Sequence, residues 1–393
     1  MNEQARQQRL QIVTLCITAF FGMAGGAMVS PTLPAIMNHF SVSGQRIGWV
    51  MGVYTLSTAV FMPVVGVLSD RLGRKRVLIP ALIINGAAGL GTALSGRFDL
   101  ILLFRFTQGI GIAGMMPLVM TLVGDLYDEQ GRLRAMGAIS ATTGVGSTLA
   151  PFIGGMLAGI IWRAPFFLYF LTIPLALLVM AFIPEKKQKR EPQHISSYFR
   201  VLTSAPNRMR ILGIMGLGLL SFVLLYSLII YIPLLLTGNP FALSEFWAGL
   251  FLAIQGITSG IAASQARRMG EAFQRPHILS IGFSLMALAL LLIFFCQAVW
   301  QIIASLLLFG CGFGSVQPQL NTWITEQVEG NRRGGVVSLF NMTKYIGQTT
   351  APMAFGAILG IASVETIFLV AGGIGCITVP LAFSLKYTRP PAS

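Results

Sequence analysis

The residues best placed for chemistry in this sequence are two cations within long apolar stretches. Arg105 lies in the stretch 100–124, and Lys344 lies in the stretch 334–360. An ionisable side chain inside a membrane-spanning segment is costly, and such residues usually handle a substrate or an ion. We therefore predict that Arg105 and Lys344 couple substrate or proton movement. For Arg105 the alternative is a guanidinium that bonds backbone carbonyls and fixes helix packing.

The acidic residues avoid the interiors of the apolar stretches. If protons drive the protein, the expected carriers are Asp70 and Asp125, at the ends of stretches, or Lys344, because lysine loses its proton readily on burial. Two cations without acids beside them favour an anionic or zwitterionic substrate over an organic cation. The 4 cysteines and 3 histidines show no metal-ligand or redox spacing. We therefore expect no metal and no cofactor.

The composition indicates a membrane protein. Of the 393 residues, 54% are hydrophobic and 10% are charged, whereas soluble domains carry roughly 25% charged residues. A helix that crosses the membrane needs roughly 17–25 apolar residues. Twelve stretches qualify, and we predict a spanning helix for each: 12–38, 46–68, 77–96, 100–124, 134–161, 164–183, 210–236, 245–266, 277–296, 299–325, 334–360 and 364–385.

The 27 Lys and Arg residues alternate in density between successive loops. With a cytoplasmic N-terminus, 22 of them fall in inside segments, and only Arg46, Arg97 and Arg163 fall outside. An excess of cations on the cytoplasmic side is the rule for membrane proteins. We predict a multi-pass protein of the inner or plasma membrane with both termini in the cytoplasm. The net charge of +14 follows from this topology, so it gives no reason to expect nucleic acid binding.

The chain divides into two similar halves around its longest polar stretch. We predict a six-helix bundle at 1–183, a cytoplasmic linker at 184–209 and a second six-helix bundle at 210–393. Residues 201 positions apart match repeatedly: Pro117 and Pro318, Asp125 and Glu326, Gly146 and Gly347, Pro151 and Pro352, Gly155 and Gly356. Two parallel repeats are typical of transporters, whose substrate site lies near the midplane between the halves.

Other polar residues within the stretches are candidates for a substrate cavity. For each of them the alternative is an interhelical hydrogen bond. These residues are Tyr54, Gln108, Tyr226, Gln255, Gln317 and Asn341. A membrane-embedded enzyme or receptor would need a catalytic constellation or a sizeable extramembrane domain, and the sequence indicates neither. We therefore predict a monomeric membrane protein that binds a small molecule and is not an enzyme.

The loop after the second stretch carries the most specific motif. Its sequence is Gly66-Val-Leu-Ser-Asp70-Arg71-Leu-Gly73-Arg74-Lys75-Arg76. This resembles the signature loop G-x-L-x-D-R-x-G-R-(K/R) of the major facilitator superfamily. The resemblance implies that the loop forms a charge network that stabilises one conformation, with Asp125 as its partner. The small Gly66 permits close helix approach, and Gly73 permits a tight turn.

Three further motifs are similar to those of the same superfamily. They are Arg105-Phe-Thr-Gln108-Gly109-Ile-Gly111, Gly146-Ser-Thr-Leu-Ala150-Pro151-Phe-Ile-Gly154-Gly155 and Pro31-Thr-Leu-Pro34. The second resembles the antiporter motif G-x-x-x-G-P-x-x-G-G, with Ala150 in place of a glycine. The third resembles a motif of the twelve-helix drug:proton antiporters. The resemblance implies the major facilitator fold and the export of amphiphilic compounds by alternating access, driven by proton influx.

Two other activities on the same fold stay open. One is a proton symporter for the uptake of a sugar or an organic anion, and the other is a lipid flippase. The signature loop does not separate these activities from export. The antiporter-like motif around Pro151 and the pair Pro31 and Pro34 favour export.

Overall fold

The computed structural model describes residues 3–185, 207–327 and 333–385. These residues are almost entirely helical, and they contain no strand. Within them, 10 helical segments are long and apolar enough to cross a membrane. Two further helices are less apolar but 30 and 27 residues long, and at 1.5 Å per residue both exceed a hydrocarbon layer of roughly 30 Å. The predicted all-α membrane fold is confirmed, and the helices of the described residues are consistent with twelve spans.

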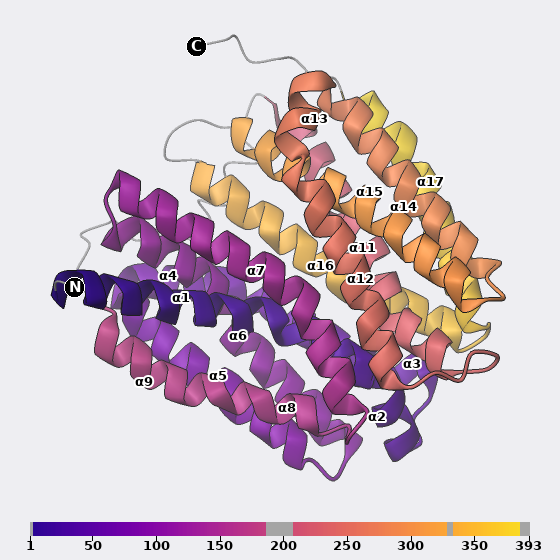
Figure 1. Ribbon diagram of the computed structural model, residues 1–393, viewed down its shortest axis with the longest axis horizontal. Helices are drawn as coiled ribbons and strands as arrows, with labels where there is room; N and C mark the ends of the chain where they lie inside the picture. Colours follow the sequence, from indigo (N-terminus) through magenta and orange to yellow (C-terminus); the bar gives the residue numbers. More distant parts are fainter. Residues whose placement is uncertain (1–2, 186–206, 328–332, 386–393) are drawn as a thin grey trace. The chain divides into compact units, whose positions relative to one another are not determined.

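The described chain forms two compact units, and 184–209, the predicted linker, lies mostly outside the described residues. The first unit contains the described residues up to 185 and also 244–250, and the second contains the other described residues. The helices of the first unit appear in indigo to magenta in Figure 1. They are α1 (Glu3–Ala27), η1 (Ser30–Thr32), α2 (Leu33–Phe40), α3 (Gly44–Ile47), α4 (Trp49–Leu72), α5 (Arg74–Leu94), α6 (Phe98–Leu126), α7 (Glu129–Ala158), α8 (Ala164–Leu168), η2 (Tyr169–Leu171) and α9 (Thr172–Phe182).

The second unit repeats the helix order of the first. Its helices are α11 (Arg208–Thr237), α12 (Glu245–Ser264, of which residues 251–264 belong to this unit), α13 (Ala266–Ala272), α14 (Arg275–Phe294), α15 (Val299–Glu326), α16 (Arg333–Leu359) and α17 (Val364–Ser384). In the first unit α1 packs on α7, and α5 packs on α6 and α9. In the second unit α11 packs on α16, and α14 packs on α15 and α17. The same neighbours therefore recur in each unit.

Prolines break the first spanning segment into three pieces. Pro31 is the second residue of the short 3-10 helix η1, and Pro34 is the second residue of α2. A proline inside a helix removes a backbone hydrogen bond and clashes with the preceding turn. The chain accommodates both prolines by tightening to a 3-10 turn, and both are buried.

Small residues of α7 allow this helix to lie directly against α1, and the two run side by side in Figure 1. A methyl group on Gly154 would collide with the backbone carbonyl of Met28, and one on Gly146 would meet the ring of Phe20 at 3.1 Å. Pro151 and Gly155, the other motif residues, are also buried in α7. Small residues are what close helix contacts in membranes require.

Gly154→Ala is expected to destabilise the protein by about 1–3 kcal/mol, because the added methyl group must push α7 away from the backbone of Met28, directly after α1. Gly144→Ala is the matched control, since nothing lies within 4 Å of a methyl group at this position of the same helix. Thermal unfolding of the purified variants measures the effect. Equal melting temperatures for both variants would mean that the α1–α7 contact is not close.

Candidate functional site

The signature loop folds into a one-residue turn between α4 and α5. Gly73 is that residue, with φ of 100°, a backbone conformation that side chains with a Cβ rarely adopt. Gly66 lies about two turns earlier in α4, where its carbonyl accepts a hydrogen bond from Ser69 Oγ at 2.7 Å. The turn directs Arg74, the first residue of α5, towards the end of α6.

Arg74 forms the central contact of this loop. Its Nη1 forms an ion pair with the Asp125 carboxylate and donates to the Thr121 carbonyl at 3.1 Å. The side chains of Arg74 and Asp125 are only 11% and 10% exposed. A shielded pair of this kind is screened much less by salt than a surface pair. It therefore fixes the α4–α5 turn to the end of α6.

The other charged residues of the loop lie outside this pair. Asp70 is half-buried, and it has no hydrogen bond or ion pair within the described part of the chain. Arg71 is exposed. The Lys75 ammonium donates to the Met180 carbonyl at 2.8 Å, which ties α5 to α9. The structure thus brings Arg74 and Asp125 together, and Asp70 takes no part in their contact.

The second unit contains an equivalent ion pair that the sequence analysis missed. Arg275, the first residue of α14, pairs with Glu326, the last residue of α15, through both guanidinium Nη atoms. Arg275 lies 201 residues after Arg74, and Glu326 lies 201 residues after Asp125. The separation of 201 residues between the repeats could have revealed this pair, because adding it to the position of Arg74 gives Arg275.

Arg105 is completely buried in the first unit. Its guanidinium donates to the carbonyls of Val50 at 3.1 Å and Gly25 at 3.2 Å, and to Gln108 Oε1 at 2.7 Å. It also lies over the Tyr54 ring, 4.1 Å from the ring centroid. These contacts join α1, α4 and α6. The geometry favours the packing role that the sequence left open as an alternative for Arg105.

The six polar candidates for a cavity separate by burial. Tyr54 and Gln108 surround Arg105 and are at most 3% exposed. Tyr226 and Gln255 are also buried, whereas Gln317 and Asn341 are partly exposed. Gln317 Nε2 donates to Ser221 Oγ at 2.8 Å, so it joins α15 to α11. Asn341 contacts Lys344.

Lys344 lies in α16 and is half-buried. Its Nζ donates to Asn321 Oδ1 at 2.7 Å and to Asn341 Oδ1 at 3.4 Å. The same atom lies 4.3 Å from the ring centroid of Phe340 and 5.9 Å from that of Phe222. Among the described residues no acidic side chain pairs with Lys344. The surroundings of this cation are therefore amide oxygens and aromatic rings.

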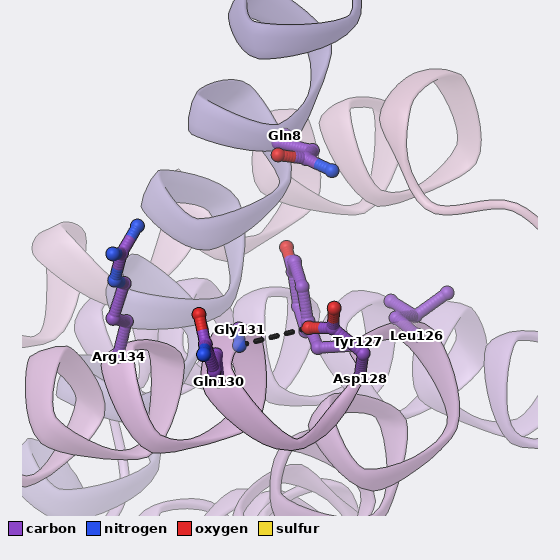
Figure 2. Close-up of a pocket in the computed structure, with 7 residues that line it drawn as sticks. All are labelled: Gln8, Leu126, Tyr127, Asp128, Gln130, Gly131 and Arg134. Carbon is purple, nitrogen blue, oxygen red and sulfur yellow. Dashed lines mark hydrogen bonds between the residues drawn. The ribbon is translucent and has the colours of Figure 1, made fainter.

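A polar pocket of about 430 Å³ lies where α1 passes the loop between α6 and α7 (Figure 2). Its lining consists of Gln8, Leu126, Tyr127, Asp128, Gln130, Gly131 and Arg134. The Asp128 carboxylate accepts the Gly131 N–H at 2.9 Å and so caps α7. Burial raises the pKa of Tyr127 to about 12, so its hydroxyl stays protonated and donates to Gln11 Oε1 at 3.4 Å. These interactions account for the polar groups of Asp128 and Tyr127.

The described residues contain no group of three or more His, Cys, Asp or Glu that would suit a metal ion. The shielded ionic groups contact one another or the backbone, and Arg105 also contacts the Gln108 amide. The described residues thus provide two ion pairs at helix ends, Arg74–Asp125 and Arg275–Glu326, and one cation, Lys344, among amide oxygens and aromatic rings.

The comparisons with known proteins agree on one protein family. A family model of the Major Facilitator Superfamily matches residues 15–263 and 214–393. The chain is 27% identical over 367 residues to the "Bacillibactin exporter" of Bacillus subtilis (strain 168), covering 90% of each sequence. It is 25% identical over 379 residues to the "Quinolone resistance protein NorA" of Staphylococcus aureus (strain MSSA476), covering 92% of this chain and 93% of that protein.

Solved structures share the fold at low sequence identity. A bacterial homologue of the human lysosomal transporter Spinster, inward-facing and occupied, matches with a TM-score of 0.79 and 17% identity over 96% of this chain and 98% of that chain. The human organic anion transporter MFSD10 (TETRAN) matches with a TM-score of 0.73 and 18% identity over 95% of this chain and 99% of that chain. At these identities the likeness shows the fold alone.

Proposed function

Because this chain belongs to the major facilitator superfamily, whose members are membrane transporters and not enzymes, we propose that it exports small amphiphilic compounds in exchange for protons. It works by alternating access, as a monomer in the plasma membrane with both termini in the cytoplasm. In this orientation the turn at Gly73 and the Arg74–Asp125 pair lie on the cytoplasmic side. When the cytoplasmic side of the transporter closes and reopens, the environment of the Arg74–Asp125 pair must change.

The observation that carries the exchange mechanism is the close contact between α1 and α7. An exchanger must not let protons leak when no substrate is bound. Gly146 and Gly154 bring the two helices into direct contact along the antiporter-like motif, which leaves no room for a water path at these positions. The names of the two curated relatives, an exporter and a drug resistance protein, support the outward direction.

Asp70 is the proposed proton carrier. It is a half-buried carboxyl group, and no described residue neutralises its charge. A carboxyl group without a fixed cationic partner is free to bind and release a proton as its surroundings change.

Asp70→Asn is expected to abolish gradient-driven transport while leaving the amount of folded protein unchanged. Glu129→Gln is the control, because it removes an exposed acidic group at the start of α7. Transport is measured in proteoliposomes, and folding by size-exclusion chromatography. Wild-type turnover in the Asp70→Asn variant would exclude Asp70 as the carrier.

The direction of transport is tested in intact cells that lack their own drug exporters. The cells are loaded with ethidium, fluorescein or Nile red (a cationic, an anionic and a neutral dye) and are then supplied with an energy source. Cells that express the protein should lose at least one dye faster than control cells, and a protonophore should stop this loss. Faster dye entry in expressing cells would instead favour the uptake symporter.

A further inference from the structure

Three helices of the second unit bring a cation, two amides and several aromatic rings together. Lys344 and Asn341 come from α16, Asn321 from α15 and Phe222 from α11. We refer to Lys344, Asn321, Asn341, Phe222, Phe313 and Phe340 as the Lys344 cluster. It shares no residue with the two ion pairs or with the Arg105 contacts.

The charge of Lys344 is not compensated within the cluster. Its ammonium has three N–H donors, and two of them reach the neutral oxygens of Asn321 and Asn341. The Nδ2 groups of these two amides have no acceptor within 3–185, 207–327 or 333–385. An uncompensated cation within a membrane-spanning helix is costly. One ammonium N–H and two amide NH₂ groups therefore remain to bind the oxygens of an anion.

Aromatic rings extend from this cation along α11 and α15. The rings of Phe222 and Phe313 meet edge to face at 5.6 Å, and Phe313 stacks on Phe309 at 6.4 Å. Phe222 and Phe313 are both partly exposed. A planar ring that is attached to the bound anion would find edge-to-face or stacked partners there, which is the arrangement that aromatic pairs prefer.

The repeat shows that the fold does not need the cluster. The first unit has Thr143 at the position equivalent to Lys344 and Met120 at the position equivalent to Asn321. It nevertheless forms the same pattern of helix neighbours. The cation and the amides of the second unit are therefore additions to a scaffold that is stable without them.

We infer that the Lys344 cluster binds the anionic group of an aromatic substrate. A carboxylate, or an acid group of similar size, accepts hydrogen bonds from Lys344 and from the amides of Asn321 and Asn341. The aromatic body of the substrate packs on Phe222 and Phe313. This inference rests on the proposed transport of small molecules, and it narrows the substrate class to aromatic organic anions.

The test is equilibrium binding to the purified full-length protein by isothermal titration calorimetry, with no ion gradient. Naphthalene-2-carboxylate is compared with naphthalene-2-carboxamide, which has the same ring and no charge. The wild type should bind the carboxylate at least about tenfold more tightly, because a hydrogen bond to a charged group is worth more than a neutral one. Lys344→Gln should remove this preference, and Lys344→Arg should keep most of it.

Arg267→Gln is the matched control, since it removes one positive charge from a side chain that is 90% exposed on α13. It should bind both compounds as the wild type does. If Lys344→Gln retains the preference for the carboxylate, or if the wild type has none, the inference is wrong. If Lys344→Gln does not fold, the inference is tested by comparing the wild type with Lys344→Arg. A folded Lys344→Arg protein that no longer prefers the carboxylate would contradict a site based on positive charge.

The aromatic part of the inference is tested with Phe222→Leu and a second probe, cyclohexanecarboxylate. The leucine keeps an apolar side chain but removes the ring, so naphthalene-2-carboxylate should bind several-fold more weakly while cyclohexanecarboxylate is little affected. Equal effects on both probes would exclude aromatic recognition by Phe222. Because binding needs no gradient, a failure of proton exchange leaves these results intact, and a failure here leaves proton exchange untouched.

Discussion

Replacing Asp125 by asparagine is expected to reduce gradient-driven transport at least about tenfold. The change removes the only acidic group that pairs with Arg74 among the described residues, in a site where both side chains are about one-tenth exposed. Breaking a shielded pair by removing one partner is strongly unfavourable, because the remaining charge is left uncompensated. The α4–α5 turn then loses its attachment to α6, and the conformation that this pair stabilises is no longer populated correctly.

Transport in proteoliposomes measures this effect, and two further variants define its cause. The double variant Arg74→Asp with Asp125→Arg restores the pair in reverse and should recover part of the activity. Asp99→Asn is the control, because Asp99 is 66% exposed in its contact with Arg46, and exposed pairs contribute roughly 0–1 kcal/mol. Full activity in the Asp125→Asn variant would show that transport does not depend on the Arg74–Asp125 pair.

Arg105→Ala is expected to destabilise the protein more than any other single change considered above. It removes the donor for two backbone carbonyls and for Gln108 in a fully buried position. Each buried polar group left without a partner costs about 1–3 kcal/mol. Arg105→Lys should restore little of this, because a lysine ammonium cannot reproduce the forked geometry of the guanidinium.

Thermal unfolding of purified variants is the measurement for Arg105, with Arg97→Ala as the control at a side chain that is 78% exposed. A clear loss of melting temperature for Arg105→Ala supports the packing role. A normal melting temperature together with a changed substrate range would instead support the coupling role that the sequence first indicated for Arg105.

The spanning helices could be predicted from the sequence because each is long enough to carry its own hydrophobic signal. The stretch 299–325, for example, became the helix Val299–Glu326. The break at Pro31 and Pro34 was not predicted, because spanning helices tolerate many prolines. Whether a proline bends a helix or ends it depends on which groups of neighbouring helices satisfy the freed backbone.

The motif comparison predicted one of the two ion pairs and missed the other. The Arg74–Asp125 contact joins residues that the family resemblance had already grouped. In the second half the loop has no matching Asp, and Gly270 lies 197 residues after Gly73 instead of 201. The short helix α13 occupies this region. The charge pair is present although the loop motif is not, because the pair depends only on the ends of α14 and α15.

The partners of Arg105 on other helices could not be identified from the sequence. Its partners include the carbonyl of Gly25, which lies 80 residues earlier in the chain. Any residue type provides a backbone carbonyl, so no side-chain pattern marks this contact. Partners on the same helix differ in this respect. Gln108 follows Arg105 by three residues and Asn341 precedes Lys344 by three, so each pair lies on one helix face.

The most direct test of proton-driven export is an imposed pH gradient across proteoliposomes that contain the purified protein. The dyes ethidium, fluorescein and Nile red are added outside, and protein-free liposomes correct for passive entry. With an acidic lumen, at least one dye should accumulate inside as protons leave, and a protonophore should abolish the accumulation. Accumulation only with an alkaline lumen would indicate symport, and entry of every dye at a rate independent of the gradient would contradict proton exchange.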